Sequence, residues 1–376
     1  MTVKKVALFC DFLNSVGGTE YYNVMLATEL KKRGIDVRLF IGEKTALKYW
    51  TNILQRNGIN YYEPEEYHQD FSNRKIEEAF MPFVIENLKA WKPDIIHCSP
   101  AGKMFLAFIT NNSRPNIPIV ATEYTTPSPA TAHWYQPDLS KYINKINALI
   151  ATCKTSLKGT RNFHKYTGHV EIIRHFIIHK EKEPVKSIKD SVGCVARFSP
   201  EKGVGFLIGA WQKVIKKHPT AKLYLYGHGP AEDYLKNLTK SLGLENNICF
   251  CGVFSPSAGI ESIVNKHAIF VQPSIFESIS TSTIELMGHS RAIIATSAGG
   301  TKELINKKTG ILVPVASTDA LSRNIIKLLK QPSLCRYYGA NARRAFVSEY
   351  NMDTNISKLL KLYDNVINKH NTTRYN

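Results

Sequence analysis

Two cations that flank a tight turn are the first residues in this sequence whose spacing could do chemistry. Arg197 and Lys202 are five positions apart, with Pro200 between them and Gly203 directly after them. A guanidinium group can hold one phosphate through two parallel hydrogen bonds, and a nearby ammonium group can neutralise a second phosphate. This pair would suit a diphosphate leaving group without a metal ion, although two ordinary surface cations are the alternative.

Two carboxylates eight positions apart are the next candidates. Glu277 should lie in a loop, and Ser280 or Thr281 can cap the helix that follows, which puts Glu285 in the first two turns of that helix. Free N–H groups at such a helix start attract anions, and ionised carboxylates accept hydrogen bonds from sugar hydroxyls. Glu285 could equally be an ordinary helix-dipole residue.

Glycine turns recur at the places where predicted strands end. Glycines allow the backbone to approach a ligand closely, and a helix N-terminus that follows them favours phosphate. None of the turns has the three-glycine spacing of a dinucleotide fingerprint, so each alone could be a plain strand–helix connection. The glycines concerned are Gly17, Gly18, Gly227, Gly229, Gly299 and Gly300.

Short apolar runs alternate with amphipathic stretches along the whole chain. Strands are predicted at 6–9, 36–41, 95–98, 117–122, 148–152, 192–196, 223–226, 248–251, 269–271 and 292–295. Helices are predicted at 20–33 (capped by Thr19), 76–91, 203–217, 231–242, 258–265, 281–289, 318–329 and 354–368. This alternation predicts an α/β protein with parallel sheets covered by helices.

The β-α-β series occurs twice, on either side of a charged segment near 180–190, which predicts two Rossmann-like doubly wound domains with a cleft between them. We expect an N-terminal acceptor-side domain over 1–185 and a C-terminal donor domain over 186–350. The segment 351–376 should be a helix whose apolar stripe packs back on the first domain. Ligands of such sheets bind beyond the carboxyl ends of the strands, where all the candidate residues fall.

The order of these motifs resembles the retaining, nucleotide-sugar-dependent glycosyltransferases of family 4, which have the two-domain GT-B fold. The matching text is Arg-x4-Lys-Gly, Gly-x-Gly-Pro, Pro-Ser-x-x-Glu-x7-Glu and Gly-Gly-x-x-Glu, dense over 192–313. It continues more thinly in the first domain, at Gly17-Gly18 and at Pro93-Asp94-Ile95-Ile96-His97. The resemblance implies a hexosyl transfer that needs no metal or other cofactor.

The resemblance also implies a role for each matching residue. Arg197 and Lys202 would bind the donor diphosphate, Glu277 the donor sugar and Glu285 the ribose. The glycines at 17–18 would close over the donor, while Gly227, Ser280, Thr281, Gly299 and Gly300 would line its site.

Two departures from the family pattern affect these roles. Ser278-Ile279-Ser280 replaces the usual Gly-Phe-Gly, which predicts a tighter pocket or a different sugar. The histidine that many relatives carry beside the reacting sugar is missing, and Glu123 or Tyr124 occupies its place. The sequence therefore assigns no catalytic base there.

Composition limits the remaining possibilities. The net charge is +18, and residues 139–170 contain no acid, which favours anionic partners and would suit a basic face that touches anionic lipid. No run is apolar and long enough to cross a membrane. The seven cysteines have no metal or disulfide spacing, so we expect a reducing, cytoplasmic compartment, with a peripheral position at the inner membrane face left open.

We therefore expect transfer from a UDP-sugar, or from a GDP-sugar, to a glycan or lipid-linked acceptor in bacterial surface polysaccharide or lipopolysaccharide synthesis. The alternatives are a nucleotide-sugar epimerase with the same fold and a non-catalytic protein that binds nucleotide sugars or anions. A nucleic-acid partner is not expected, because the basic residues are dispersed.

Overall fold

The chain folds into two compact units. The computed structural model describes residues 3–15, 17–65, 79–136, 138–177, 188–253 and 259–375. The first unit consists of Met1–Phe176 together with Met352–Asn376, and the second consists of Ile177–Asn351. The boundaries predicted from the sequence are after residue 185 and after residue 350. Most of the charged segment near 180–190 lies outside the described residues.

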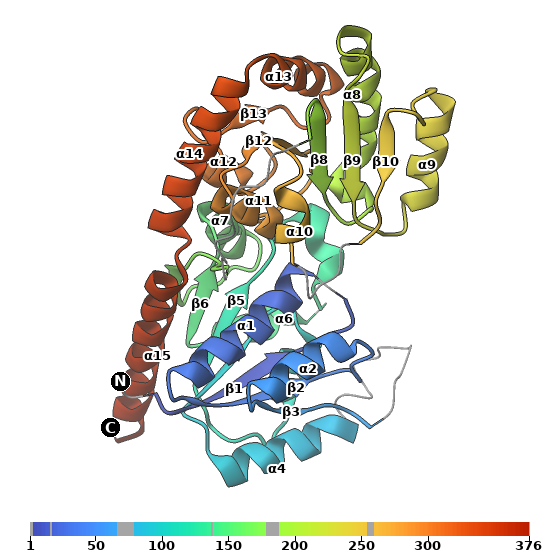
Figure 1. Ribbon diagram of the computed structural model, residues 1–376. Coiled ribbons are helices and arrows are strands. Elements are labelled where there is room, and N and C mark those ends of the chain that lie inside the picture. The colour runs from blue at the N-terminus through green and yellow to red at the C-terminus, as the bar shows by residue number, and fades with distance from the viewer. Residues whose placement is uncertain are drawn as a thin grey trace. The chain divides into compact units, whose positions relative to one another are not determined.

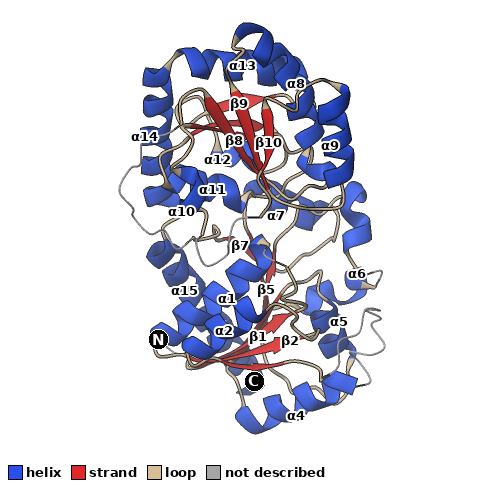
Figure 2. Cartoon of the chain, turned by 45° about the vertical axis from the view of Figure 1, so that its right-hand side comes forward, coloured by secondary structure: helices blue, strands red, loops and turns tan. Residues whose placement is uncertain are grey.

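The first unit contains a seven-stranded parallel sheet in the order β3-β2-β1-β4-β5-β6-β7. Its inner strands are buried on both faces, as expected when helices cover a parallel sheet (Figures 1 and 2). The strands are β1 (Lys5–Cys10), β2 (Asp36–Ile41), β3 (Asn60–Tyr62), β4 (Ile95–Cys98), β5 (Ile119–Glu123), β6 (Ala148–Ala151) and β7 (His169–Ile172). The helices are α1 (Gly18–Lys32), α2 (Lys48–Arg56), α4 (Met81–Trp91), α5 (Lys103–Thr110), α6 (Leu139–Tyr142), α7 (Lys154–Asn162) and α15 (Met352–Tyr375), with 3-10 turns η2 (Pro129–Trp134) and η3 (Ile143–Lys145).

The second unit contains a six-stranded parallel sheet in the order β10-β9-β8-β11-β12-β13. Its strands are β8 (Ser191–Val195), β9 (Lys222–Tyr226), β10 (Ile248–Phe250), β11 (Ile269–Gln272), β12 (Ala292–Thr296) and β13 (Ile311–Val313). Its helices are α8 (Val204–Lys217), α9 (Glu232–Ser241), α10 (Glu261–Val264), α11 (Thr281–Gly288), α12 (Thr301–Leu304), α13 (Thr318–Lys330) and α14 (Pro332–Glu349), with one 3-10 turn, η4 (Pro200–Lys202). The prediction of two doubly wound α/β sheets is confirmed.

The C-terminal helix α15 belongs to the first unit (Figure 1). The Tyr363 hydroxyl hydrogen-bonds to Nδ1 of His97 on β4, and the Thr122 hydroxyl on β5 lies 2.7 Å from Nε2 of the same ring. The N–H of Val3 donates to Asp364 over 2.9 Å. Burial lowers the pKa of His97 to about 3, so the ring is neutral and its hydrogen bonds to Tyr363 and Thr122 carry no charge.

Some predicted boundaries were wrong. Thr19 does not cap the first helix, because α1 already begins at Gly18 and its N-cap is Gly17, which has no side chain to offer. Parts of the predicted helices at 76–91 and 258–265 lie outside the described residues, and the described helices there are α4 and α10. The short strands β3, β7 and β13 were missed.

Candidate active site

The topological switch point of the second sheet lies between β8 and β11. The chain runs outward from β8 through β9 to β10 on one side, and from β11 through β12 to β13 on the other. The loops after β8 and after β11 therefore separate at the carboxyl edge, where open α/β sheets bind their ligands. The first loop carries Arg197 and Lys202, and the second carries Glu277.

Backbone hydrogen bonds join these two loops directly. The N–H groups of Ile275 and Phe276 both donate to the carbonyl of Glu201, over 2.8 and 3.2 Å. Gly203, with a φ of +64°, packs against the carbonyl of Pro273 so closely that no Cβ would fit. A glycine is required there for both reasons.

Lys202 and Glu277 meet where the two loops touch. The Lys202 ammonium donates to Glu277 over 2.7 Å, and the Ser274 hydroxyl donates to the same carboxylate oxygen over 3.3 Å. The side chains are 25% and 11% exposed, so the pair is largely withdrawn from water but still reachable. Such a pair could exchange partners with an incoming anion, because each charged group is already held in place by the other and is still partly exposed.

Arg197 lies at the edge of this arrangement and is more open. Its guanidinium donates to Glu201 over 2.8 Å and is 66% exposed. The Ser199 hydroxyl donates to the same Glu201 oxygen over 2.6 Å. Partial burial alone would raise the pKa of Glu201, but the hydrogen bonds from Ser199 and Arg197 lower it, so this carboxylate is ionised and holds the Arg197 side chain beside the turn.

The predicted glycine turns connect to the same loops. The N–H of Phe198 donates to the carbonyl of His228 over 2.9 Å, in the turn that contains Gly227. The N–H of Gly300 donates to the carbonyl of Ser278 over 2.8 Å. Gly299, with a φ of +46°, lies against the carbonyl of Glu277 with no room for a Cβ. The loops after β8, β9, β11 and β12 thus form one connected rim.

The helix α11 begins at this rim. Ser280 is its N-cap and accepts a hydrogen bond from the N–H of Thr283 over 3.1 Å, while Thr281 is the first helical residue. Glu285 lies in the second turn, where burial and the nearby charge of Glu261 raise its pKa to about 8. The sequence predicts an ionised acceptor at Glu285, whereas this raised pKa favours the neutral acid at pH 7, which can also donate one hydrogen bond.

The glycines at 17–18 form the start of α1 in the first unit. The carbonyl of Gly17 accepts the N–H of Tyr21 over 3.0 Å, and the side chain of Glu20 lies against the Cα of Gly17. The Ser15 hydroxyl donates to Glu20, which is 5% exposed. This carboxylate already complements the helix N-terminus, so a phosphate could bind there only if Glu20 turned away.

Glu123 is the last residue of β5, and Tyr124 is the residue that follows it. The two side chains have different surroundings. Glu123 is fully buried and accepts hydrogen bonds from the N–H and the hydroxyl of Thr125, over 2.9 and 2.7 Å. Burial raises its pKa to about 7. Tyr124 is half-buried, and its hydroxyl donates to Asn23 over 3.0 Å. Glu123 therefore has no exposed surface for a substrate, and it positions the loop that Thr125 begins.

No role was predicted from the sequence for three polar residues at these edges. Ser199 and Ser274 donate to the carboxylates of Glu201 and Glu277, and Asp11 accepts the N–H of Met104 over 2.9 Å, joining the loops after β1 and β4. The serines lie in the loops after β8 and β11, within four residues of the strand ends and among the candidate residues, which is the signal that could have found them. Asp11 directly follows β1, but its partner is 93 residues away.

Family models cover both units of the chain. Residues 16–180 match the model described as Glycosyltransferase Family 4, and residues 176–345 match the model described as Glycosyl transferases group 1. The chain belongs to the glycosyltransferases. The predicted family resemblance and enzyme class are thereby confirmed.

Several named relatives support this membership. An uncharacterized glycosyltransferase of Haemophilus influenzae is 24% identical over 97% of this chain and 100% of its own. The poly(ribitol-phosphate) alpha-N-acetylglucosaminyltransferase of Staphylococcus aureus is 25% identical over 60% of this chain and 46% of its own. The lipopolysaccharide core biosynthesis mannosyltransferase of Rhizobium leguminosarum is 26% identical over 47% of this chain and 51% of its own. The match spans only about half the length of the last two.

Solved structures confirm the GT-B fold of this glycosyltransferase. Sucrose-phosphate synthase from Thermosynechococcus elongatus superposes with a TM-score of 0.79 at 17% identity, covering 97% of this chain and 100% of that one. The Anabaena protein HepE, crystallised with UDP and glucose, superposes with a TM-score of 0.77 at 18% identity, covering 96% and 99%.

The described residues lack two further features, a membrane-spanning helix and a metal-binding cluster. Within the described ranges, no helix is both long enough and apolar enough to cross a bilayer. The same part of the chain contains no cluster of three His, Cys, Asp or Glu side chains that could hold a metal ion.

Proposed function

We propose that this glycosyltransferase moves a hexosyl group, with retention of anomeric configuration, from a nucleoside-diphosphate sugar to a glycan or lipid-linked acceptor. UDP is the favoured nucleotide and GDP the second. The observation that carries the proposal is the Lys202–Glu277 ion pair at the switch point, which brings a phosphate-binding cation and a hydroxyl acceptor within 2.7 Å of each other.

Donor binding would exchange the partners of this pair. The diphosphate would take the Lys202 ammonium and the Arg197 guanidinium, and the freed Glu277 carboxylate would accept hydrogen bonds from hydroxyls of the donor sugar. Negative charge grows on the diphosphate as the bond to the sugar breaks, so fixed cations stabilise the transition state more than the ground state. The positive charges of Lys202 and Arg197 would replace a metal ion in this role.

The transfer itself needs few side chains. The bond between the anomeric carbon and the phosphate oxygen breaks, and a bond to the acceptor oxygen forms on the same face of the sugar. The acceptor proton goes to the leaving phosphate oxygen. This front-face route is consistent with the buried position of Glu123 and with the hydrogen bond between Tyr124 and Asn23, which leave neither residue poised as a base.

We further propose that the acceptor belongs to bacterial surface polysaccharide or lipopolysaccharide, and that the enzyme works in the cytoplasm in peripheral contact with the membrane. The relatives named for lipopolysaccharide core and for poly(ribitol-phosphate) support the first part. Exposed lysines of the acid-free segment 139–170, among them Lys154, Lys158 and Lys165, support contact with anionic lipid.

Thermal stabilisation by nucleotides tests donor binding. Saturating UDP with EDTA present should raise the melting temperature by about 3 °C or more, whereas Lys202→Met should lose most of that shift. Lys216→Met, on the exposed last turn of α8, is the matched control. An equal shift in wild type and Lys202→Met would place the nucleotide elsewhere, and a shift that appears only with magnesium would overturn the metal-free site.

Turnover of Glu277→Ala tests the reaction. The variant should remain folded and keep UDP binding but lose sugar transfer, and Glu245→Ala, exposed in the loop before β10, should be unaffected. Unchanged transfer by Glu277→Ala would remove this site assignment. Release of an isomerised nucleotide sugar, without transfer to any acceptor, would favour the epimerase.

A further inference from the structure

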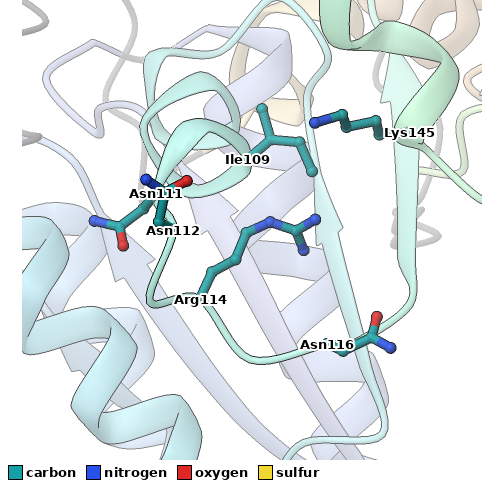
Figure 3. Close-up of a pocket in the computed structure, with 6 residues that line it drawn as sticks. All are labelled: Ile109, Asn111, Asn112, Arg114, Asn116 and Lys145. Atoms are coloured by element: carbon teal, nitrogen blue, oxygen red, sulfur yellow. The ribbon is translucent and has the colours of Figure 1, made fainter.

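A polar pocket lies at the amino edge of the first sheet, opposite the carboxyl edge that carries Glu123 and Tyr124. It has a volume of about 270 Å³ and is lined by Ile109, Asn111, Asn112, Arg114, Asn116 and Lys145 (Figure 3). Residues 111–118 lead from α5 into the amino end of β5, and Lys145 lies just before β6. The carboxyl edge at Glu123 is one strand length away, about 15 Å at the usual rise per residue. The pocket is therefore separate from the edge that carries Glu123 and Tyr124.

The pocket contains cations without counterions. Its lining has two positive side chains and no carboxylate. Figure 3 shows Arg114 and Lys145 reaching toward the same space from two different segments. Neither has an ion pair with any described residue. The Arg114 guanidinium carbon lies 5.6 Å from the Phe108 ring centroid, and the Lys145 ammonium lies 5.1 Å from that of Tyr142.

Arg114 is partly withdrawn from water, which sets it apart from an ordinary surface cation. Its side chain is half-buried, and this desolvation lowers its pKa. Removing a cation from water without giving it an anion costs free energy, which a bound anion would recover. By contrast, Lys202, which is also partly buried, has the Glu277 carboxylate at 2.7 Å.

Asparagine amides add neutral donors beside the cations. No hydrogen bond joins the side chain of Asn112 or of Asn116 to any described residue, so both amides are available to a ligand. Asn111 already uses its oxygen to accept the N–H of Ser113 over 2.9 Å, which leaves its amide N–H₂ as a donor. A guanidinium, an ammonium and amide N–H groups without a competing carboxylate form the donor set that a phosphate group requires.

We propose that this pocket binds a phosphate group, held by Arg114 and Lys145, on the side of the first unit away from its carboxyl edge. The group could come from a phospholipid headgroup or from a soluble phosphate ester, and the chemistry of recognition is the same. The site does not depend on the proposed sugar transfer, because none of its residues lies at the carboxyl edge of either sheet.

Phosphate binding by a double variant tests the site. The background is Arg197→Gln/Lys202→Met, so that the candidate donor site does not contribute to the signal. Titration of inorganic phosphate, followed by NMR, should show that adding Arg114→Gln/Lys145→Gln weakens binding tenfold or more, because each charge-assisted hydrogen bond is worth about a factor of ten. Lys216→Gln/Lys217→Gln, which removes two exposed lysines of the last turn of α8, should change it by less than about threefold.

Vesicle flotation distinguishes the two sources. Wild-type protein, Arg114→Gln/Lys145→Gln and the control Lys216→Gln/Lys217→Gln are each mixed with phosphatidylglycerol or phosphatidylcholine vesicles. If only Arg114→Gln/Lys145→Gln loses phosphate binding, the result supports the site. If the same variant also loses binding to phosphatidylglycerol vesicles, the phosphate group belongs to a lipid headgroup. If vesicle binding is unchanged, a soluble phosphate ester is the source. Equal behaviour of the pocket variant and the control in both assays, with the same melting temperature, would overturn the proposal.

Discussion

The carboxyl edge of the second sheet and the part of the first sheet's carboxyl edge near β5 are built from opposite kinds of polar contact. In the second unit the edge is ionic: Lys202 pairs with Glu277, and Arg197 pairs with Glu201. In the first unit the edge near β5 is held by neutral hydrogen bonds, such as that between Tyr124 and Asn23. Burial lowers the pKa of His175, which packs against Tyr124, to about 4, so this ring is neutral as well.

This difference indicates which half handles charge. Ion pairs that remain partly open can exchange partners with an incoming anion at small cost, because one counterion replaces another. A closed set of neutral hydrogen bonds gains nothing from an anion and would expose polar groups if it opened. The contrast predicts that removing a charge from the second unit's edge lowers turnover strongly. In the first unit, changes in packing or protonation should instead alter the stability of the fold.

The largest expected effect is on turnover when Lys202 is neutralised. Lys202→Met removes the less exposed of the two candidate phosphate cations, and loss of one fixed electrostatic donor typically costs about 10²–10³ in kcat. Steady-state transfer at saturating donor is the measurement, with Lys216→Met as the control. A loss below about fivefold would remove the distinction between the two edges.

A glycine comparison should show the next largest effect, on stability. Gly299 has a φ of +46° and lies against the Glu277 carbonyl, so Gly299→Ala should destabilise the protein by about 2–4 kcal/mol. Gly17, with a φ of −105°, meets only the flexible end of Glu20, so Gly17→Ala should cost less than about 1 kcal/mol. Urea unfolding of both variants measures these changes. Equal losses of unfolding free energy would mean that the backbone around Gly299 and Glu277 can move to accept a Cβ atom.

A pH experiment addresses the neutral edge. Burial raises the pKa of Glu123 to about 7 in the folded state, whereas in the unfolded chain the carboxyl group loses its proton near its ordinary pKa of 4.5. Stability should therefore fall as the pH rises through this window. Glu123→Gln cannot ionise, and its amide keeps an oxygen that can accept hydrogen bonds from Thr125 and Tyr135. Relative to wild type, its free energy of unfolding should therefore gain about 2 kcal/mol between pH 5 and pH 7.5.

The groups that face Glu123 make this prediction specific. Thr125 and Tyr135 donate to Oε1, and Nε2 of His164 lies 3.8 Å from Oε2. Burial lowers the pKa of His164 to about 4, so it stays neutral across the window. Denaturant unfolding at both pH values, with the exposed Glu86→Gln as control, is the measurement. A difference between variant and wild type that does not change with pH would mean that Glu123 is ionised throughout.

Much of this organisation could be predicted from the sequence, for a physical reason. Fully buried parallel strands are continuous apolar runs, and 36–41 and 95–98 were predicted with the bounds that the structure has. The glycine turns and the Ser280 cap are local features, so they too are readable. The exposed short strands were not: β3 is Asn60–Tyr62 and β7 is His169–Ile172, and neither is apolar enough to stand out.

The protonation and pairing of the site could not be predicted in the same way. Lys202 and Glu277 are 75 residues apart, and only the sheet topology brings them together. The sequence offered Glu123 and Tyr124 as equals, but their environments differ, because the strand turns one side chain into the core and the next residue toward Asn23. The raised pKa of Glu285 depends on its burial and on Glu261, which lies in another helix.

The smallest expected effect distinguishes the two cations of the ionic edge from each other. Arg197 is 66% exposed against 25% for Lys202, so salt and water screen its charge more strongly. Arg197→Gln should raise the donor KM several-fold, up to about tenfold, with a smaller change in kcat. Raising the ionic strength from 50 to 500 mM should reduce the difference between Arg197→Gln and wild type, but leave most of the defect of Lys202→Met. If high salt reduces the defects of Arg197→Gln and Lys202→Met equally, both cations act as screened surface charges. In that case the lower exposure of Lys202 gives it no distinct role.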